Sequence, residues 1–158
     1  MKSSPYVTAE GMFRLNQELS ERWQRRREVV QALAAAAAEG DRSENAEYIY
    51  RKKELRELDR RIRYLQKRLP DLKVVDQVPD DQEKIFFGAW VTLETASGDE
   101  VCYRTVGPDE IDFEKGNISV DSPMARALLG KVIDDEIIIR VQEEARHFFV
   151  LAIRYPTP

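Results

Sequence analysis

A single cysteine, Cys102, and a single histidine, His147, are all that the sequence offers for disulfide or zinc chemistry. One cysteine excludes a disulfide within the chain, and the pair falls short of the four Cys or His ligands of a structural zinc site. We therefore interpret both as ordinary strand residues. The 158 residues are enough to bury a modest core in one ordinary domain or two small ones.

Long apolar runs are also missing. No stretch approaches the roughly 20 apolar residues that a helix needs to cross a bilayer, and the first residues, MKSSPYVTAEG, lack the apolar centre of a signal peptide. The composition, 34% charged and 42% hydrophobic, describes a soluble protein. We expect a cytoplasmic protein with no membrane partner.

The net charge of -4 hides a division of charge along the chain. Residues 1–69 carry 16 Lys and Arg against 11 Asp and Glu, whereas residues 70–158 carry 9 against 18. The first part is therefore positive and the second strongly negative. This asymmetry indicates that the N-terminal part meets a polyanion, although solvated helix faces can be charged without such a purpose.

Two helical patterns occupy the first part. Thr8 is a suitable N-cap for a helix that runs to about Glu39, and a second pattern ends at Pro70. Both show the 3,4 spacing of a heptad seam. The first seam consists of Met12, Leu15, Leu19, Val29, Leu33 and Ala36, interrupted by Arg22 and Arg26; the second consists of Tyr48, Leu55, Leu58, Ile62, Leu65 and Leu69. Because a short turn joins the two helices, residues 1–75 are predicted to form an antiparallel coiled-coil hairpin.

The second part has the pattern of strands. A polar linker with two prolines leads to strand-like runs at 85–95, 101–106, 117–120, 136–142 and 148–155, and the segment SPMARALLG predicts one short helix that begins at Pro123. Residues 76–158 are therefore predicted to form a small, mostly antiparallel sheet with one helix. The fold class is α+β, a helical hairpin followed by a small sheet domain.

Two carboxylates, Asp41 and Glu44, lie in the turn between the helices. One interpretation is a capping box, in which an acidic pair three residues apart satisfies N–H groups at a helix start. The other is chemistry, in which the pair helps hold Mg²⁺. Two carboxylates are too few to hold this ion alone, so they would act only within a partner's site. The five alanines that precede the turn favour helix strongly, and they would also make a thin end that fits a narrow opening.

Cations recur on the second helix at 3,4 spacing and so form one stripe. They are Lys53, Arg56, Arg60, Arg63 and Lys67, with Lys52 beside the end nearest the turn. The stripe could guide a nucleic-acid backbone. Alternatively, Glu54, Glu57 and Asp59 could neutralise it in ion pairs typical of coiled-coil flanks. Nearby, Tyr48 fits the seam, whereas Tyr50 lies off it and could stack on a base.

Several of these segments together resemble the bacterial Gre transcript-cleavage factors, in particular their GreB branch. The segments are GDRSENAEY at the turn, KKELRELDRRIRYL in the second helix, FFGAWV in the first strand and DSPMARALLGK before the closing strands. The resemblance runs along nearly the whole chain in the right order. The first helix departs from it, because RWQRRREVVQALAAAAAEG is richer in arginine and alanine than the family pattern.

The resemblance implies a fold, a partner and a site. The hairpin would enter the secondary channel of RNA polymerase, and the second domain, which resembles the FKBP fold, would dock at the channel rim. Asp41 and Glu44 match the family's tip carboxylates, which help the polymerase hold a catalytic Mg²⁺ and position the attacking water. The free protein would bind no cofactor, and it would be a monomer that donates residues to the polymerase and is not itself an enzyme.

The resemblance also assigns two surfaces. Lys52, Lys53, Arg56 and Arg60 match the basic patch that holds the extruded RNA 3′ end. Asp121, Ser122 and Pro123 match the segment that docks on the polymerase. Three other functions stay open: a channel-occupying inhibitor of the same build, a prolyl isomerase suggested by the FKBP likeness alone, and a coiled-coil chaperone, which would expose apolar residues at its tip.

Overall fold

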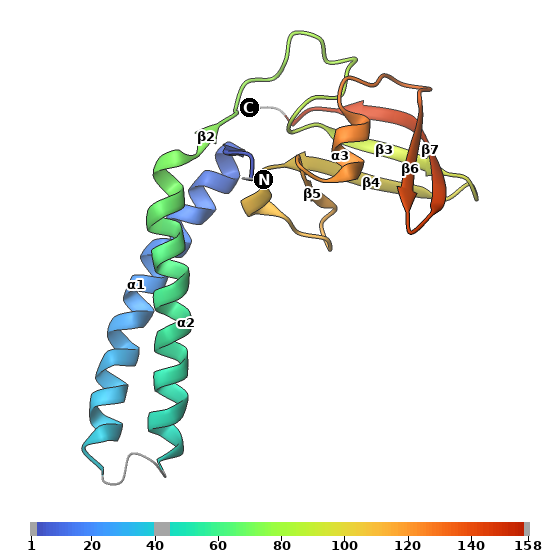
Figure 1. Ribbon diagram of the computed structural model, residues 1–158. Coiled ribbons are helices and arrows are strands. Elements are labelled where there is room, and N and C mark those ends of the chain that lie inside the picture. The colour runs from blue at the N-terminus through green and yellow to red at the C-terminus, as the bar shows by residue number, and fades with distance from the viewer. Residues whose placement is uncertain (1–2, 40–44, 157–158) are drawn as a thin grey trace. The chain divides into compact units, whose positions relative to one another are not determined.

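The protein consists of two compact units in a computed structural model that describes residues 3–39 and 45–156 (Figure 1). The hairpin unit is Met12–Asp71. The globular unit combines the chain up to Gly11 with the chain from Leu72 onward. The predicted boundary near residue 75 assigned the first eleven residues to the hairpin, whereas in the structure they belong with the sheet.

The hairpin unit is made of two long helices that lie side by side (Figure 1), α1 (Ala9–Ala37) and α2 (Ala46–Arg68). A short 3₁₀ helix, η1 (Leu69–Asp71), follows α2 and passes through Pro70. Apolar side chains at seam positions are buried, among them Leu15, Val29 and Ala36 on α1 and Leu58, Ile62 and Leu65 on α2. The predicted helical hairpin is therefore confirmed, and each fully buried Leu, Ile or Val contributes about 1.5–3 kcal/mol.

Interhelical ion pairs fix the direction of the two helices. Arg61 on α2 pairs with Glu18, near the start of α1. Further along α1, Arg25 pairs with Glu54, which lies seven residues earlier on α2 than Arg61. Because the partner on α2 moves back as α1 moves forward, the helices are antiparallel.

The globular unit contains a five-stranded sheet in the order β5-β4-β3-β7-β6 (Figure 1). The strands are β3 (Trp90–Thr95), β4 (Glu100–Val106), β5 (Asn117–Ser119), β6 (Glu136–Val141) and β7 (Glu144–Arg154). Every pairing is antiparallel except β4 with β5. The predicted mostly antiparallel sheet is confirmed. The first strand begins at Trp90 and not at Ile85, because Gly88 takes a left-handed conformation with φ of +88° that interrupts extended backbone.

One short helix, α3 (Pro123–Leu128), packs on the sheet, and a 3₁₀ helix, η2 (Pro108–Glu110), precedes β5. The core combines Leu128 of α3 with side chains from four other segments: Ile85, Ala89, Val91, Leu93, Ile137, Ile139, Phe148 and Val150. Ile85 thus packs in the core although it lies outside the strand. In the described residues, none of the helices is both long and apolar enough to span a membrane.

Two further strands of two residues each hold the N-terminal segment to the globular unit. β1 (Tyr6–Val7) pairs in parallel with β2 (Lys73–Val74), and Val7 is fully buried. Next to it, the Thr8 N–H donates to the carboxylate of Glu110 at 3.0 Å. These contacts are the physical reason why the first eleven residues belong to the sheet-containing unit.

Candidate functional site

The predicted catalytic pair, Asp41 and Glu44, lies outside the described residues. The structure does describe how α2 begins. A capping box led by Asp41 would require a helix that starts at residue 42, whereas α2 starts at Ala46 and its N-cap is Asn45. The start of α2 is therefore capped by Asn45, and the two carboxylates precede this cap in the sequence.

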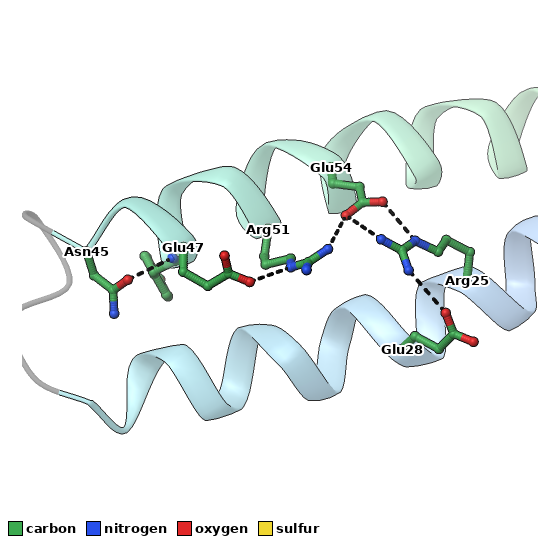
Figure 2. Close-up of polar contacts among 7 residues, drawn as sticks. Arg25, Glu28, Asn45, Glu47, Arg51 and Glu54 are labelled. Atoms are coloured by element: carbon green, nitrogen blue, oxygen red, sulfur yellow. Dashed lines mark hydrogen bonds and ion pairs between the residues drawn. The ribbon is translucent and has the colours of Figure 1, made fainter.

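Asn45 forms hydrogen bonds with the backbone of both helices near the turn. Its Oδ1 accepts a hydrogen bond from the Tyr48 N–H at 3.1 Å, which caps α2 (Figure 2), and its Nδ2 donates to the carbonyl of Ala36 at 2.8 Å. An asparagine at an N-cap satisfies one of the four unpaired N–H groups of a helix start. By also holding a carbonyl of the last turn of α1, Asn45 fixes the spacing of the two helices beside the turn.

A network of ion pairs lies next to this cap (Figure 2). Arg25 on α1 donates to Glu54 on α2 through Nε at 2.9 Å and Nη2 at 3.2 Å, and to Glu28 at 3.1 Å. Arg51 donates to Glu47 at 2.8 Å and to Glu54 at 3.0 Å. The hydrogen bond from Arg25 is the main reason that the pKa of Glu54 is lowered. Glu54 is therefore engaged by two arginines at once.

The arginines that interrupt the predicted seam form ion pairs too. Arg26 donates to Asp59 on α2 at 2.6 Å. Arg22 donates to Glu18 at 2.6 Å, and the same carboxylate accepts from Arg61 at 2.7 Å and 3.0 Å. The arginine-rich stretch of α1 thus supplies cations that pair with carboxylates on both helices.

The predicted RNA-binding cations are of a different kind. Lys52, Lys53, Arg56 and Arg60 are all exposed. In the described parts of the chain none of them forms an ion pair, although the Lys52 ammonium lies 5.8 Å from the centre of the Tyr48 ring. Two of the three carboxylates that could have neutralised them, Glu54 and Asp59, pair instead with Arg25 and Arg26 of α1. We call Lys53, Arg56 and Arg60, with Lys52 beside them, the basic stripe.

The predicted docking residues lie at the start of α3. The Ser122 Oγ accepts from the Ala125 N–H at 3.2 Å and caps the helix, and Pro123 is its first residue. Asp121 is engaged within the chain: its carboxylate accepts from the Ser4 N–H at 2.9 Å and from the Ser4 hydroxyl. Asp121 therefore holds the N-terminal segment against the segment that the resemblance assigns to docking.

An apolar groove of about 380 Å³ opens beside these residues. Ser122, Pro123 and Met124 line it, together with apolar side chains of the sheet and of the loop before β5, including Ile111 and Phe113. Phe113 is 84% exposed. No periodic pattern marks Phe113 in the sequence, where its one signal is that an aromatic side chain stands between the acidic residues Asp112 and Glu114.

The described residues contain no group of three or more His, Cys, Asp or Glu side chains that could hold a metal ion. His147 donates or accepts through Nδ1 with Glu136 at 2.6 Å, and Cys102 lies exposed on β4.

Family comparisons cover both units. Residues 5–74 match the family described as "Transcription elongation factor, N-terminal", and residues 80–155 match "Transcription elongation factor, GreA/GreB, C-term". Residues 75–79, which follow β2, lie between the two matched ranges.

Individual relatives match over nearly the full length. A protein of Pseudomonas aeruginosa named "Transcription elongation factor GreB" is 54% identical over 97% of this chain and 92% of its own length. A protein of Xanthomonas axonopodis pv. citri with the same name is 57% identical over 98% of this chain and 93% of its own. Among solved structures, that of the GreA factor homolog 1 protein of Thermus thermophilus covers 94% of this chain and 97% of its own, at 28% identity and a TM-score of 0.43.

Proposed function

Because this chain belongs to the GreA/GreB family of transcription elongation factors, we propose that it stimulates RNA polymerase to cleave its own backtracked transcript. The hairpin enters the secondary channel of the polymerase, where the extruded RNA 3′ end lies. Hydrolysis there leaves a new 3′ hydroxyl from which elongation resumes.

The separation of charge on the hairpin is the observation that carries the proposal. The arginines that face the other helix are held by carboxylates, among them Arg25 by Glu54 and Arg26 by Asp59. The basic stripe on α2 stays exposed and unpaired among the described residues. An unneutralised row of cations attracts a phosphate backbone and releases its counterions, so binding weakens as salt rises. Extruded RNA is a ligand of this kind.

Asp41 and Glu44 are proposed to act at the tip. Their carboxylates would complete the oxygen ligands of a Mg²⁺ ion that the polymerase already holds, because two carboxylates add to such a site and do not form one alone. When bound, this ion supplies charge stabilisation and an activated water for phosphodiester hydrolysis. Asn45 leaves the pair available for this work, because it caps α2 itself.

The globular unit is proposed to dock on the polymerase rim through Asp121, Ser122 and Pro123. The apolar groove that Ser122 and Pro123 line supports this assignment, since an exposed aromatic such as Phe113, which also lines it, is the kind of residue that anchors a protein interface. The chain would then act as a monomer in the cytoplasm, where its partner works, and would donate residues without being a free-standing nuclease.

Transcript cleavage in stalled, backtracked polymerase complexes tests the proposal. The intact protein should speed RNA shortening at fixed Mg²⁺, and the Asp41→Ala, Glu44→Ala double variant should bind the polymerase without speeding it. If the intact protein binds but shortens nothing, the chain is an inhibitor that occupies the channel. If it does not bind polymerase, the proposal is wrong.

A further inference from the structure

Two exposed tyrosines lie on the flank of the basic stripe. Tyr50 is 60% exposed and Tyr64 is 42% exposed, so neither serves the buried seam. They are two heptads apart on α2, which places them on one side of the helix about 21 Å from each other. The cations of the basic stripe fall between them in the sequence.

Each tyrosine ring has an arginine against it. The guanidinium of Arg51 lies 5.4 Å from the centre of the Tyr50 ring, and that of Arg61 lies 5.3 Å from the centre of the Tyr64 ring. A guanidinium at this distance is attracted to the ring face. The same arrangement of an exposed ring and a neighbouring arginine thus occurs twice along the stripe.

Carboxylates hold both arginines in place. Arg51 donates to Glu47 at 2.8 Å and to Glu54 at 3.0 Å. Arg61 donates to Glu18 on the other helix at 2.7 Å and 3.0 Å. Because each arginine is held beside its ring, the attraction between them favours one ring orientation, and this reduces the side-chain entropy that is lost when a ligand stacks there.

An exposed, oriented ring beside unpaired cations fits single-stranded RNA. Proteins that bind single strands without sequence preference combine a basic track for the phosphates with aromatic rings on which bases stack. We propose that Tyr50 and Tyr64 each stack a base of the RNA whose phosphates lie on the basic stripe. This assignment rests on the proposed function, because the RNA is the extruded transcript end.

A direct binding measurement tests the stacking. The full-length protein is titrated at low salt into a fluorescein-labelled single-stranded RNA of about 15 nucleotides, and anisotropy gives the affinity. Tyr50→Ala and Tyr64→Ala should each weaken binding about fivefold or more, the loss expected for one stacked base. Tyr50→Phe and Tyr64→Phe keep the ring and should bind within about twofold of the unchanged protein.

Phe13 provides the matched control. It is an aromatic residue on α1 that is 69% exposed and has no arginine over its ring in the described structure. Phe13→Ala should leave RNA affinity unchanged, and circular dichroism of every variant checks that the helices are intact. Equal loss in Phe13→Ala and the tyrosine variants, or no loss in the latter, would overturn the assignment.

Cleavage assays separate this inference from the proposed function. If the intact protein stimulates cleavage, and the alanine variants bind RNA and stimulate cleavage of long extruded transcripts as well as it does, the stacking is wrong and the function stands. If the intact protein stimulates nothing, the proposed function fails, and the RNA titration still decides the stacking. Reduced cleavage of long transcripts with unchanged cleavage of short ones, together with weaker RNA binding, is the expected result.

Discussion

The carboxylate of Glu110 lies in the space that a β-carbon at Gly11 would occupy, with Oε1 only 1.8 Å from that position. Glu110 is buried, and its carboxylate accepts from the Thr8 N–H at 3.0 Å, from the Thr8 hydroxyl and from the Gly107 N–H at 2.7 Å. Thr8 in turn caps α1, because its Oγ1 accepts from the Gly11 N–H at 3.0 Å. The first turn of α1 is thus held to the loop around η2, and only glycine leaves room for this contact.

Gly11→Ala should therefore destabilise the globular unit. The new β-carbon would displace the carboxylate from its buried donors, and an unsatisfied buried donor costs about 1–3 kcal/mol. This loss exceeds the gain of roughly 1 kcal/mol that alanine has over glycine in a helix. Urea unfolding followed by the fluorescence of Trp90 would measure it in a Trp23→Phe background, since these are the protein's two tryptophans and Trp90 lies in the globular unit.

Ser20→Ala is the control for this prediction, because Ser20 is an exposed residue of the same helix. The free energy of unfolding of the Ser20→Ala variant should differ from that of the parent by no more than about 0.5 kcal/mol. A Gly11→Ala protein that unfolds at the same urea concentration as the parent would mean that Glu110 moves aside without cost.

Removal of the tip carboxylates should separate cleavage from binding. Asp41→Ala or Glu44→Ala is expected to lower cleavage stimulation by about a hundredfold or more, the order found when a group that stabilises transition-state charge is lost. Affinity for polymerase should change little, because docking is assigned to the globular unit. Cleavage rates in backtracked complexes and competition for polymerase would be measured on the same preparations.

Glu39→Ala serves as the control for the tip, since Glu39 is an exposed carboxylate close to the turn in sequence. It should leave cleavage unchanged. If Asp41→Ala instead loses polymerase binding in proportion to its loss of cleavage, the carboxylates serve structure or docking and not chemistry.

The apolar groove yields a prediction about docking. Phe113→Ala and Pro123→Ala should each weaken polymerase binding by about 1–2 kcal/mol, or roughly tenfold, because residues at the centre of an interface dominate its energy. Ile133→Ala, at an exposed apolar site outside the groove, should have no effect. Equal affinity of all three variants would remove the groove from the docking surface.

Asp121 requires a separate test because it already has a partner within the chain. Its carboxylate accepts from Ser4, so Asp121→Ala can weaken docking by releasing the N-terminal segment. Ser4→Ala removes the hydroxyl bond and leaves the carboxylate. If Asp121 contacts polymerase directly, Ser4→Ala should bind within about twofold of the parent while Asp121→Ala loses about tenfold. An equal loss of polymerase affinity in Ser4→Ala and Asp121→Ala would mean that Asp121 acts by anchoring the N-terminal segment.

The hairpin should lose stability in acid through Glu18. Hydrogen bonding by Arg61 is the main cause that lowers the pKa of Glu18, with Arg22 adding to it. Since the pKa in the folded state lies below the ordinary value of 4.5, the stabilisation is present above that pH and is lost as pH falls through the folded pKa. This partly exposed group should contribute about 0.5–1 kcal/mol.

Thermal unfolding of the hairpin, followed by Trp23 fluorescence between about pH 6 and pH 3, would show this effect. Glu18→Gln should be less stable than the parent near neutral pH and should approach it in acid. Glu21→Gln is the control, because Glu21 is exposed and forms no ion pair within the described residues. If the unfolding temperatures of the parent and of Glu18→Gln fall in parallel as pH is lowered, the prediction is wrong.

The seam spacing was sufficient to predict both long helices, because burial of apolar side chains at 3,4 positions is a local pattern, and the short turn between them predicted their antiparallel order. The pairing of β1 with β2 could not be predicted from the sequence pattern. A strand of two residues has no periodicity, and this pairing joins residues more than sixty positions apart. Phe113 was missed for a related reason. A single exposed aromatic gains meaning only from the groove that the fold builds around it.

The sequence alone did not decide whether carboxylates neutralise the cations of α2, and the reason is geometric. Glu54 lies three residues from Arg51, and Asp59 lies three residues from Arg56 and four from Arg63, so both carboxylates could have paired within α2 alone. The positions of Arg25 and Arg26 across the helix interface decide the matter, because both reach these carboxylates from α1. Such a preference depends on the register of the two helices, which the spacing within one helix does not contain.

Neutralising the basic stripe should weaken the capture of long extruded RNA more than cleavage near the active site. Arg56→Gln with Arg60→Gln removes two exposed cations and keeps side chains that favour helix. Removing each cation that binds a phosphate should reduce the slope of log affinity against log salt by about 0.7 for a single strand. Anisotropy titrations of labelled RNA at several salt concentrations would measure this slope.

Arg27→Gln tests whether position matters and not charge alone. Arg27 is an exposed arginine on α1 that hydrogen-bonds Gln24 at 3.2 Å and forms no ion pair among the described residues. Its loss changes the net charge as much as one stripe substitution does. If the stripe guides RNA, Arg27→Gln should keep the salt slope within about 0.2 of the parent, whereas Arg56→Gln with Arg60→Gln should lower it by more than about 1. Equal slopes per charge removed would mean that RNA responds only to the overall charge of the hairpin, and the stripe would have no special role.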